Sequence, residues 1–181
     1  RMFSRLLSQI PAFFGLVLRF GIICLVMGLL CFLIGEMMPR KNFDYRAFPY
    51  ACHAWERNGD VYLKLGINRW KDKVPDMSRY IPHTFRKKIG VMRSPEHVEG
   101  LIRETCVAEL VHVVLILLSP VFLVLLPRGW NWICMLLYDI FGNLPFILIQ
   151  RYNRPRLVIL LERQREVQAM QAAKRAARAL S

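Results

Sequence analysis

A glutamate and a histidine that could perform acid–base chemistry lie close together in an apolar part of the chain, Ala108-Glu109-Leu110-Val111-His112. Residues three apart share one face of a helix, so the carboxylate of Glu109 could orient the imidazole of His112 and stabilise its charge. An imidazole held in this way is a general base near neutral pH. A charged residue in a membrane span costs about 2.5–3.5 kcal/mol, so such residues are candidates for function.

Two further polar residues, Asp139 and Asn143, lie four apart in the next apolar stretch and share one helix face. If the two stretches pack together, these side chains could meet Glu109 and His112 within the membrane. A structural cluster, holding the helices together by hydrogen bonds, is the alternative interpretation. A metal site is disfavoured, because the diiron bundles that use Glu-x-x-His need two such motifs and further carboxylates. We therefore expect no metal and no resident cofactor.

Three arginines follow within six residues, in the run Gln150-Arg151-Tyr152-Asn153-Arg154-Pro155-Arg156. Guanidinium groups bind phosphate and pyrophosphate through paired hydrogen bonds. Long basic side chains at a span end also reach lipid headgroups, and the composition does not separate these two roles.

The apolar content and the net charge of the chain indicate which kind of helices must position these residues. The chain has 181 residues, of which 55% are apolar, yet its formal charge is +13. Its mean hydropathy of +0.29 excludes a disordered basic tail and a soluble nucleic-acid-binding module. Apolar and basic residues must therefore occupy different parts of the chain.

Three apolar stretches are long enough to span a bilayer, which needs about 20 helical residues. We predict an all-α integral membrane protein, a single domain over 1–181, with transmembrane helices at 10–35, 107–126 and 130–150. Pro120 predicts a kink in the second helix, and the short loop at 127–129 makes the second and third an antiparallel pair. A signal peptide at the first stretch is disfavoured by its length and by the lack of a cleavage site, and residues upstream of Arg1 are an open question.

The basic residues flank these stretches: 14 of the 26 lie in 40–103 and eight in 151–178. The positive-inside rule predicts both regions on the cytoplasmic side of a multi-pass cell-membrane protein. Anionic lipid then accounts for the charge, and we expect no nucleic-acid partner. The interfacial region 36–106 includes a possible β-hairpin at 58–67 and a helix start with Ser94 as cap and Pro95 first. A basic amphipathic helix is predicted at 155–180.

No histidine is followed five residues later by aspartate, so the usual glycerolipid acyltransferase motif is absent. The Ala108–His112 segment and the run from Asn143 to Leu157 nevertheless resemble the glycosyl-4,4'-diaponeurosporenoate acyltransferase family. The stretch Arg69-Trp70-Lys71-x-Lys73 resembles that family's tryptophan–lysine stretch. The match covers roughly residues 60–160. Members are small bacterial membrane enzymes that add a fatty acyl chain to the sugar of a glycosylated carotenoid acid, in staphyloxanthin-type pigment synthesis.

The resemblance implies an acyltransferase in which His112, oriented by Glu109, deprotonates a hydroxyl of a glycosylated lipid or carotenoid. Asn143 and Tyr152 would donate hydrogen bonds to the oxyanion. Acyl-CoA or acyl carrier protein would be the acyl donor, and the lipid bilayer is the other expected partner. The remaining substrate-binding residues would be Arg151, Asn153, Arg154, Arg156, Asp139, Trp70 and Lys71.

Two other classes stay open at this stage, a non-catalytic lipid-binding or assembly protein and a metal-dependent membrane oxidase. The sequence does not indicate the oligomeric state.

Overall fold

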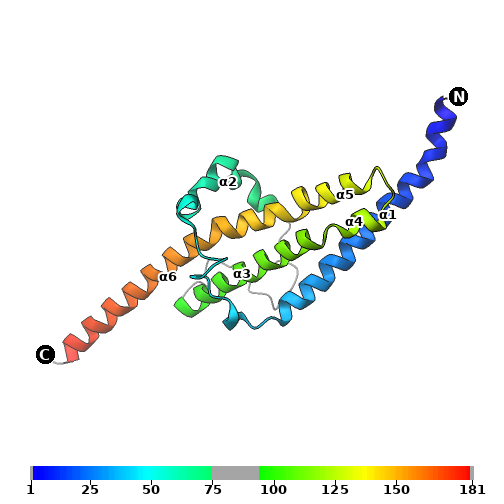
Figure 1. Ribbon diagram of the computed structural model, residues 1–181. Helices are drawn as coiled ribbons and strands as arrows, with labels where there is room; N and C mark the ends of the chain where they lie inside the picture. Colours follow the sequence, from blue (N-terminus) through cyan, green and yellow to red (C-terminus); the bar gives the residue numbers. More distant parts are fainter. Residues whose placement is uncertain (1, 75–93, 180–181) are drawn as a thin grey trace. The chain divides into compact units, whose positions relative to one another are not determined.

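The computed structural model describes residues 2–74 and 94–179, and within these ranges every regular element is helical (Figure 1). Three helical segments are long and apolar enough to cross a membrane, Pro11–Met37, Pro95–Leu125 and Asn131–Arg178. Each exceeds the roughly 20 residues that a hydrocarbon core requires. The chain is therefore an all-α membrane protein, and the fold class predicted from sequence is confirmed.

The first span lies in α1 (Met2–Met37) and the second in α3 (Pro95–Leu118) with α4 (Val121–Leu125). The helix start predicted at Ser94 is confirmed, because the Ser94 hydroxyl accepts a hydrogen bond from the backbone N–H of His97 at 3.3 Å. This helix is continuous with the second candidate span, which begins at Pro95 and not at 107 as predicted. The sequence predicts a kink at Pro120, and the helix is interrupted there, since α3 ends at Leu118 and α4 begins at Val121.

The third span joins α5 (Asn131–Leu137), a π-helical turn η6 (Tyr138–Asn143) and α6 (Leu144–Ala179). The sequence predicts separate helices at 130–150 and 155–180, whereas the structure continues one helix through Pro155. Proline inside a helix removes one backbone hydrogen bond, yet α6 remains a single helix from Leu144 to Ala179. The π turn adds a residue to one helical turn, a feature often found at functional sites.

The described residues form two compact units, and the first comprises those of Arg1–Met38 and Leu110–Ile147. Its core is apolar. The Phe122 ring is fully buried, and its centroid lies 5.3 Å from that of Phe20 and 5.0 Å from that of Tyr138. The other buried members of this core are Leu16, Cys31, Leu115, Leu126 and Cys134.

The second unit comprises the described residues of Pro39–Glu109 and Leu148–Ser181. Short helices fill its first part, and they are η1 (Arg40–Asn42), η2 (Ala54–Leu65), α2 (Ile67–Trp70) and η3 (Lys71–Lys73). Tyr62 and Ile67 from these short helices pack with Tyr152 of α6 in a small buried core. In Figure 1 the α2 segment lies alongside α6.

The β-hairpin predicted at 58–67 is wrong, because this segment coils into helical turns. Arg57, Asn58 and Gly59 have φ angles of 48°, 55° and 88°, which reverse the chain through the left-handed region. The following turns bury Tyr62 and Ile67 in one core. No strand in the described ranges is present for this segment to pair with.

Gly59 is required by a close approach as well as by its backbone angle. A Cβ there would lie 2.6 Å from Nη1 of Arg156 and 3.0 Å from the Tyr152 carbonyl oxygen. Gly66 also has a positive φ, 66°, but a Cβ there would meet nothing within 4 Å. We therefore expect Gly59→Ala to lower the melting temperature in detergent by several degrees more than Gly66→Ala does. Equal melting temperatures for the two variants would contradict the close packing described.

Candidate functional site

The first unit holds one polar pair that combines two predicted catalytic residues. Nδ1 of His112, on α3, and Oδ1 of Asn143, at the end of the π turn, lie 2.9 Å apart. Asn143 is 1% exposed, and the His112 ring stacks on Phe146 with a centroid distance of 4.4 Å and an interplanar angle of 9°. The sequence predicts that Asp139 and Asn143 meet Glu109 and His112, and of these contacts the structure shows the one between His112 and Asn143.

The hydrogen bonds of Asn143 determine which nitrogen of His112 carries the proton. The side-chain amide nitrogen of Asn143 donates to the carbonyl oxygen of Tyr138 at 3.1 Å, so its Oδ1 is the atom that faces the imidazole. An amide oxygen only accepts, so Nδ1 of His112 must donate. In the neutral ring this leaves a lone pair on Nε2, the arrangement that a general base needs.

Asp139 makes a separate contact in the same unit. Its Oδ2 accepts a hydrogen bond at 2.9 Å from the hydroxyl of Ser119, a buried residue at the break between α3 and α4. Its Oδ1 is also buried and has no hydrogen-bond partner among the described residues. Asp139 thus bonds across to the second span, but through Ser119, and its substrate-binding role stays a prediction.

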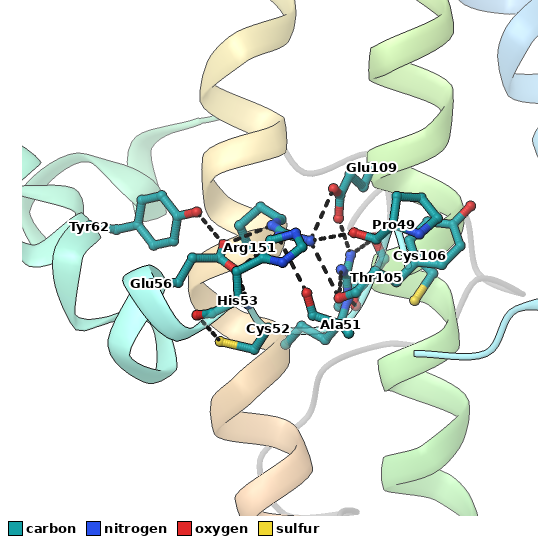
Figure 2. Close-up of polar contacts among 12 residues, drawn as sticks. Pro49, Ala51, Cys52, His53, Glu56, Tyr62, Thr105, Cys106, Glu109 and Arg151 are labelled. Atoms are coloured by element: carbon teal, nitrogen blue, oxygen red, sulfur yellow. Dashed lines mark hydrogen bonds and ion pairs between the residues drawn. The ribbon is translucent and has the colours of Figure 1, made fainter. Parts of the chain in front are cut away.

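The second unit contains a buried ion cluster built around Arg151 of α6 (Figure 2). Nε and Nη2 of Arg151 donate to the two carboxylate oxygens of Glu56, both at 2.8 Å, and Glu56 is 0% exposed. The same guanidinium donates to the backbone carbonyls of Pro49, Tyr50 and Ala51 at 2.9–3.4 Å. Arg151 therefore holds the segment that precedes η2 against α6.

Arg154 extends this cluster to α3. Its Nε donates to the Thr105 hydroxyl at 2.8 Å, and Nη2 donates to the Thr105 carbonyl at 3.0 Å and to Oε2 of Glu109. Its Nη1 donates to the Tyr50 carbonyl at 2.8 Å. Oε1 of Glu109 also lies 3.5 Å from Nη1 of Arg151. Two buried arginines thus face two buried glutamates, and their charges cancel.

These contacts bear on three predicted roles. The carboxylate of Glu109 binds arginines, so orientation of His112 by Glu109 stays a prediction, whereas Asn143 is a described partner of the imidazole. Arg151 and Arg154 direct their donors to protein acceptors, so binding of a substrate phosphate would require them to exchange these partners.

Four of the other predicted binding residues gather on the second unit, although they come from distant parts of the sequence. Lys71 and Arg156 lie over the ring of Tyr152, and Trp70 packs against the core that includes Tyr152. The Tyr152 hydroxyl, predicted as an oxyanion donor, donates instead to Oδ1 of Asn68 at 2.6 Å. Asn153 is half-buried on α6.

Sequence reasoning missed Glu56, Tyr62, Thr105 and Phe146. The available signal for Glu56 was the spacing His53-x-x-Glu56, since the Glu56 carboxylate accepts from the His53 backbone N–H at 2.6 Å as in a capping box. Burial alone would raise the pKa of the Glu56 carboxyl. Hydrogen bonds from Tyr62, His53 and Arg151 outweigh burial and hold that pKa below its ordinary value.

Removing the charge of Glu56 should destabilise the protein strongly. In Glu56→Gln the buried guanidinium of Arg151 loses its bidentate partner, which typically costs about 3–5 kcal/mol. Asp60→Asn is the matched control, because it removes the acid of the exposed Arg156–Asp60 pair. We expect a large loss of melting temperature for Glu56→Gln and a small one for Asp60→Asn.

The lowered pKa of Glu56 also predicts how the stability difference between wild type and Glu56→Gln depends on pH. A carboxyl whose pKa is lower in the folded protein contributes stability above its ordinary pKa, about 4.3, and loses it as pH falls through the lower folded value. The gap in melting temperature between wild type and Glu56→Gln should therefore stay constant from pH 7 to about 5 and close at lower pH. A gap that does not change with pH would contradict an ionised Glu56.

Within the described ranges, no group of three or more His, Cys, Asp or Glu side chains is arranged to hold a metal ion.

Comparison with known proteins identifies the family. A family model described as glycosyl-4,4'-diaponeurosporenoate acyltransferase matches residues 39–163. The enzyme of that name from Staphylococcus aureus strain USA300 is 31% identical over 130 residues, which cover 71% of this chain and 77% of the relative. The strain N315 protein is 29% identical over 131 residues, with the same coverage. No solved structure matches.

The matched range includes His112, Asn143, the ion cluster and the Tyr152 region. The resemblance inferred from the sequence is confirmed, and the enzyme class is acyltransferase. The chain therefore belongs to the glycosyl-4,4'-diaponeurosporenoate acyltransferase family.

Proposed function

We propose that this membrane protein transfers a fatty acyl group from a thioester donor to a hydroxyl on the sugar of a glycosylated lipid or carotenoid, with His112 as the general base. The observation that carries the proposal is the His112–Asn143 pair, which lies in the range matched by an acyltransferase family. Polar side chains are rare in apolar membrane helices because their burial costs free energy, so such a pair is a candidate for function.

The proposed reaction uses the free nitrogen of the imidazole. Nε2 of His112 takes the proton of the acceptor hydroxyl as its oxygen bonds to the acyl carbonyl carbon. The bond from that carbon to the thioester sulfur then breaks, and the imidazolium returns the proton to the leaving thiolate. The products are a sugar ester and a free thiol, so no oxidant or metal is required.

Asn143 is the residue to which we assign the orientation of His112. Its Oδ1 accepts from Nδ1, and its Nδ2 is held by the Tyr138 carbonyl, so the amide cannot turn without losing both contacts. The second hydrogen on Nδ2 is the donor available for the oxyanion. Glu109 then acts through the ion cluster, where it balances the charges of Arg151 and Arg154.

His112→Ala tests the proposal. We expect turnover to fall by about 10²–10⁴-fold, the usual contribution of a general base, while the melting temperature stays near that of wild type. The assay measures transfer of labelled palmitate from palmitoyl-CoA, or from palmitoyl carrier protein, to a glycolipid acceptor in nanodiscs. Asn143→Asp keeps an acceptor for Nδ1 and should retain more activity than Asn143→Leu.

His97→Ala is the matched control, since it removes a histidine from the same helix outside the pair. Full activity of His112→Ala would overturn the assignment. A loss of melting temperature in His112→Ala and Asn143→Leu, without any transferase activity of the wild type, would favour the non-catalytic lipid-binding or assembly protein.

We infer that the basic regions at 40–103 and 151–178 face the cytoplasm of a cell-membrane protein, as the positive-inside rule predicts. Cys52 reports on this orientation, because it is the exposed one of the five cysteines and lies outside the candidate spans. A membrane-impermeant maleimide should label Cys52 in permeabilised cells and not in intact ones, with Cys52→Ser as the unlabelled control. Labelling in intact cells would place this region outside.

A further inference from the structure

Two cations of the second unit lie over one aromatic ring. Cζ of Arg156 is 3.8 Å from the centroid of the Tyr152 ring, and Nζ of Lys71 is 5.5 Å from it. The ring belongs to the buried core and Tyr152 is 6% exposed. The side chains of Lys71 and Arg156 are 28% and 34% exposed, so both charges can reach a ligand in solvent.

The surrounding contacts hold these cations in place. The Tyr152 hydroxyl donates to Oδ1 of Asn68 at 2.6 Å, which ties α6 to α2. Nη1 of Arg156 donates to the Tyr152 carbonyl at 2.8 Å, and Trp70 packs against the core beside Lys71. Because the ring and its neighbours are already ordered, a ligand would pay little to organise the site.

The charges of Lys71 and Arg156 are weakly compensated compared with those of Arg151 and Arg154. Nζ of Lys71 lies 4.0 Å from Asp72, and Nη2 of Arg156 lies 2.9 Å from Asp60. These carboxylates are 78% and 64% exposed, and exposed pairs are screened and contribute little. Residues 54–74 contain five lysines and arginines against three acids, one of which, Glu56, is bound by Arg151.

The sequence position of Tyr152 also suits a ligand that arrives from water. It follows the start of the third span, Asn131, by about 20 residues, the length that crosses a hydrocarbon core. A water-soluble acyl donor carries its charge at the end opposite to the acyl chain. Its charged end is therefore expected at such a boundary.

We propose that Lys71 and Arg156, held over Tyr152, bind the phosphate of the phosphopantetheine that carries the acyl chain. This group is common to acyl-CoA and acyl carrier protein, and the inference rests on the proposed acyl transfer. Lys71 supplies a point charge, whereas Arg156 exchanges its exposed bond to Asp60 for the phosphate.

The test compares ligands that differ by this phosphate. Full-length protein in nanodiscs of zwitterionic lipid is titrated with palmitoyl-phosphopantetheine and with palmitoyl-pantetheine. Charge-assisted hydrogen bonds of ordinary strength predict a Kd at least about ten-fold lower for the phosphorylated ligand. Lys71→Ala should remove most of that preference, and Lys71→Arg should retain it. Lys41→Ala, an exposed lysine of the same unit, should leave it unchanged.

Palmitoyl-CoA and palmitoyl carrier protein, titrated in parallel, identify the natural source of the phosphate. Equal Kd values for the two pantetheine ligands would overturn the proposal, and so would equal losses in Lys71→Ala and Lys41→Ala. An effect of Lys71→Ala that appears only in anionic nanodiscs would assign the site to lipid headgroups instead. Binding that prefers phosphate without acyl transfer would reject the proposed function alone, and acyl transfer without that preference would reject this subsite alone.

Discussion

Buried ion pairs determine how the second unit is built. They join Arg151 and Arg154 of α6 to Glu56 and Glu109. These groups are buried, and a buried charge is tolerated only when it is paired and hydrogen-bonded. Arg151 binds Glu56 and the carbonyls that precede η2, and Arg154 binds Glu109 and Thr105 of α3. Two segments that are far apart in the chain, residues 49–56 and α3, are thereby held to α6. Because all partners are needed for neutrality, the cluster acts as one structural unit.

The first unit follows a related constraint, since polar groups in an apolar environment must bond to one another. Its Ser119–Asp139 and His112–Asn143 contacts each include a residue at an irregularity of a helix. Ser119 is at the break between α3 and α4, and both Asp139 and Asn143 belong to the π turn. From the π turn, Asp139 contacts Ser119 and Asn143 contacts His112, both of which belong to the second span. The imidazole of His112 is thereby held by Asn143 within an apolar unit.

Four basic residues from the two stretches that resemble the family divide into two groups with different physical behaviour. Arg151 and Arg154 are buried and paired with glutamates, and these pairs connect α6 to η2 and α3. Lys71 and Arg156 reach solvent and face only exposed acids, so their charges are available to a ligand. Arginines of the run 150–156 therefore differ in their contacts. Arg151 and Arg154 hold parts of the fold together, and we propose that Arg156 binds the acyl donor.

The sequence by itself determined the membrane class, the number of long apolar helices, the helix start at Ser94, the irregularity at Pro120 and the family. These follow from local composition, from capping chemistry and from a motif, all of which are read along the chain. Tertiary structure alone decided which charges are paired. Glu109 and His112 share a helix face by spacing, yet Arg154 and Asn143 are the partners they bind. The helical turns at 58–67 could not be predicted from the local sequence either. They bury Tyr62 and Ile67 against Tyr152, which lies on a helix some 90 residues away. Pairing between distant segments depends on distances in space, which local spacing along the chain does not specify.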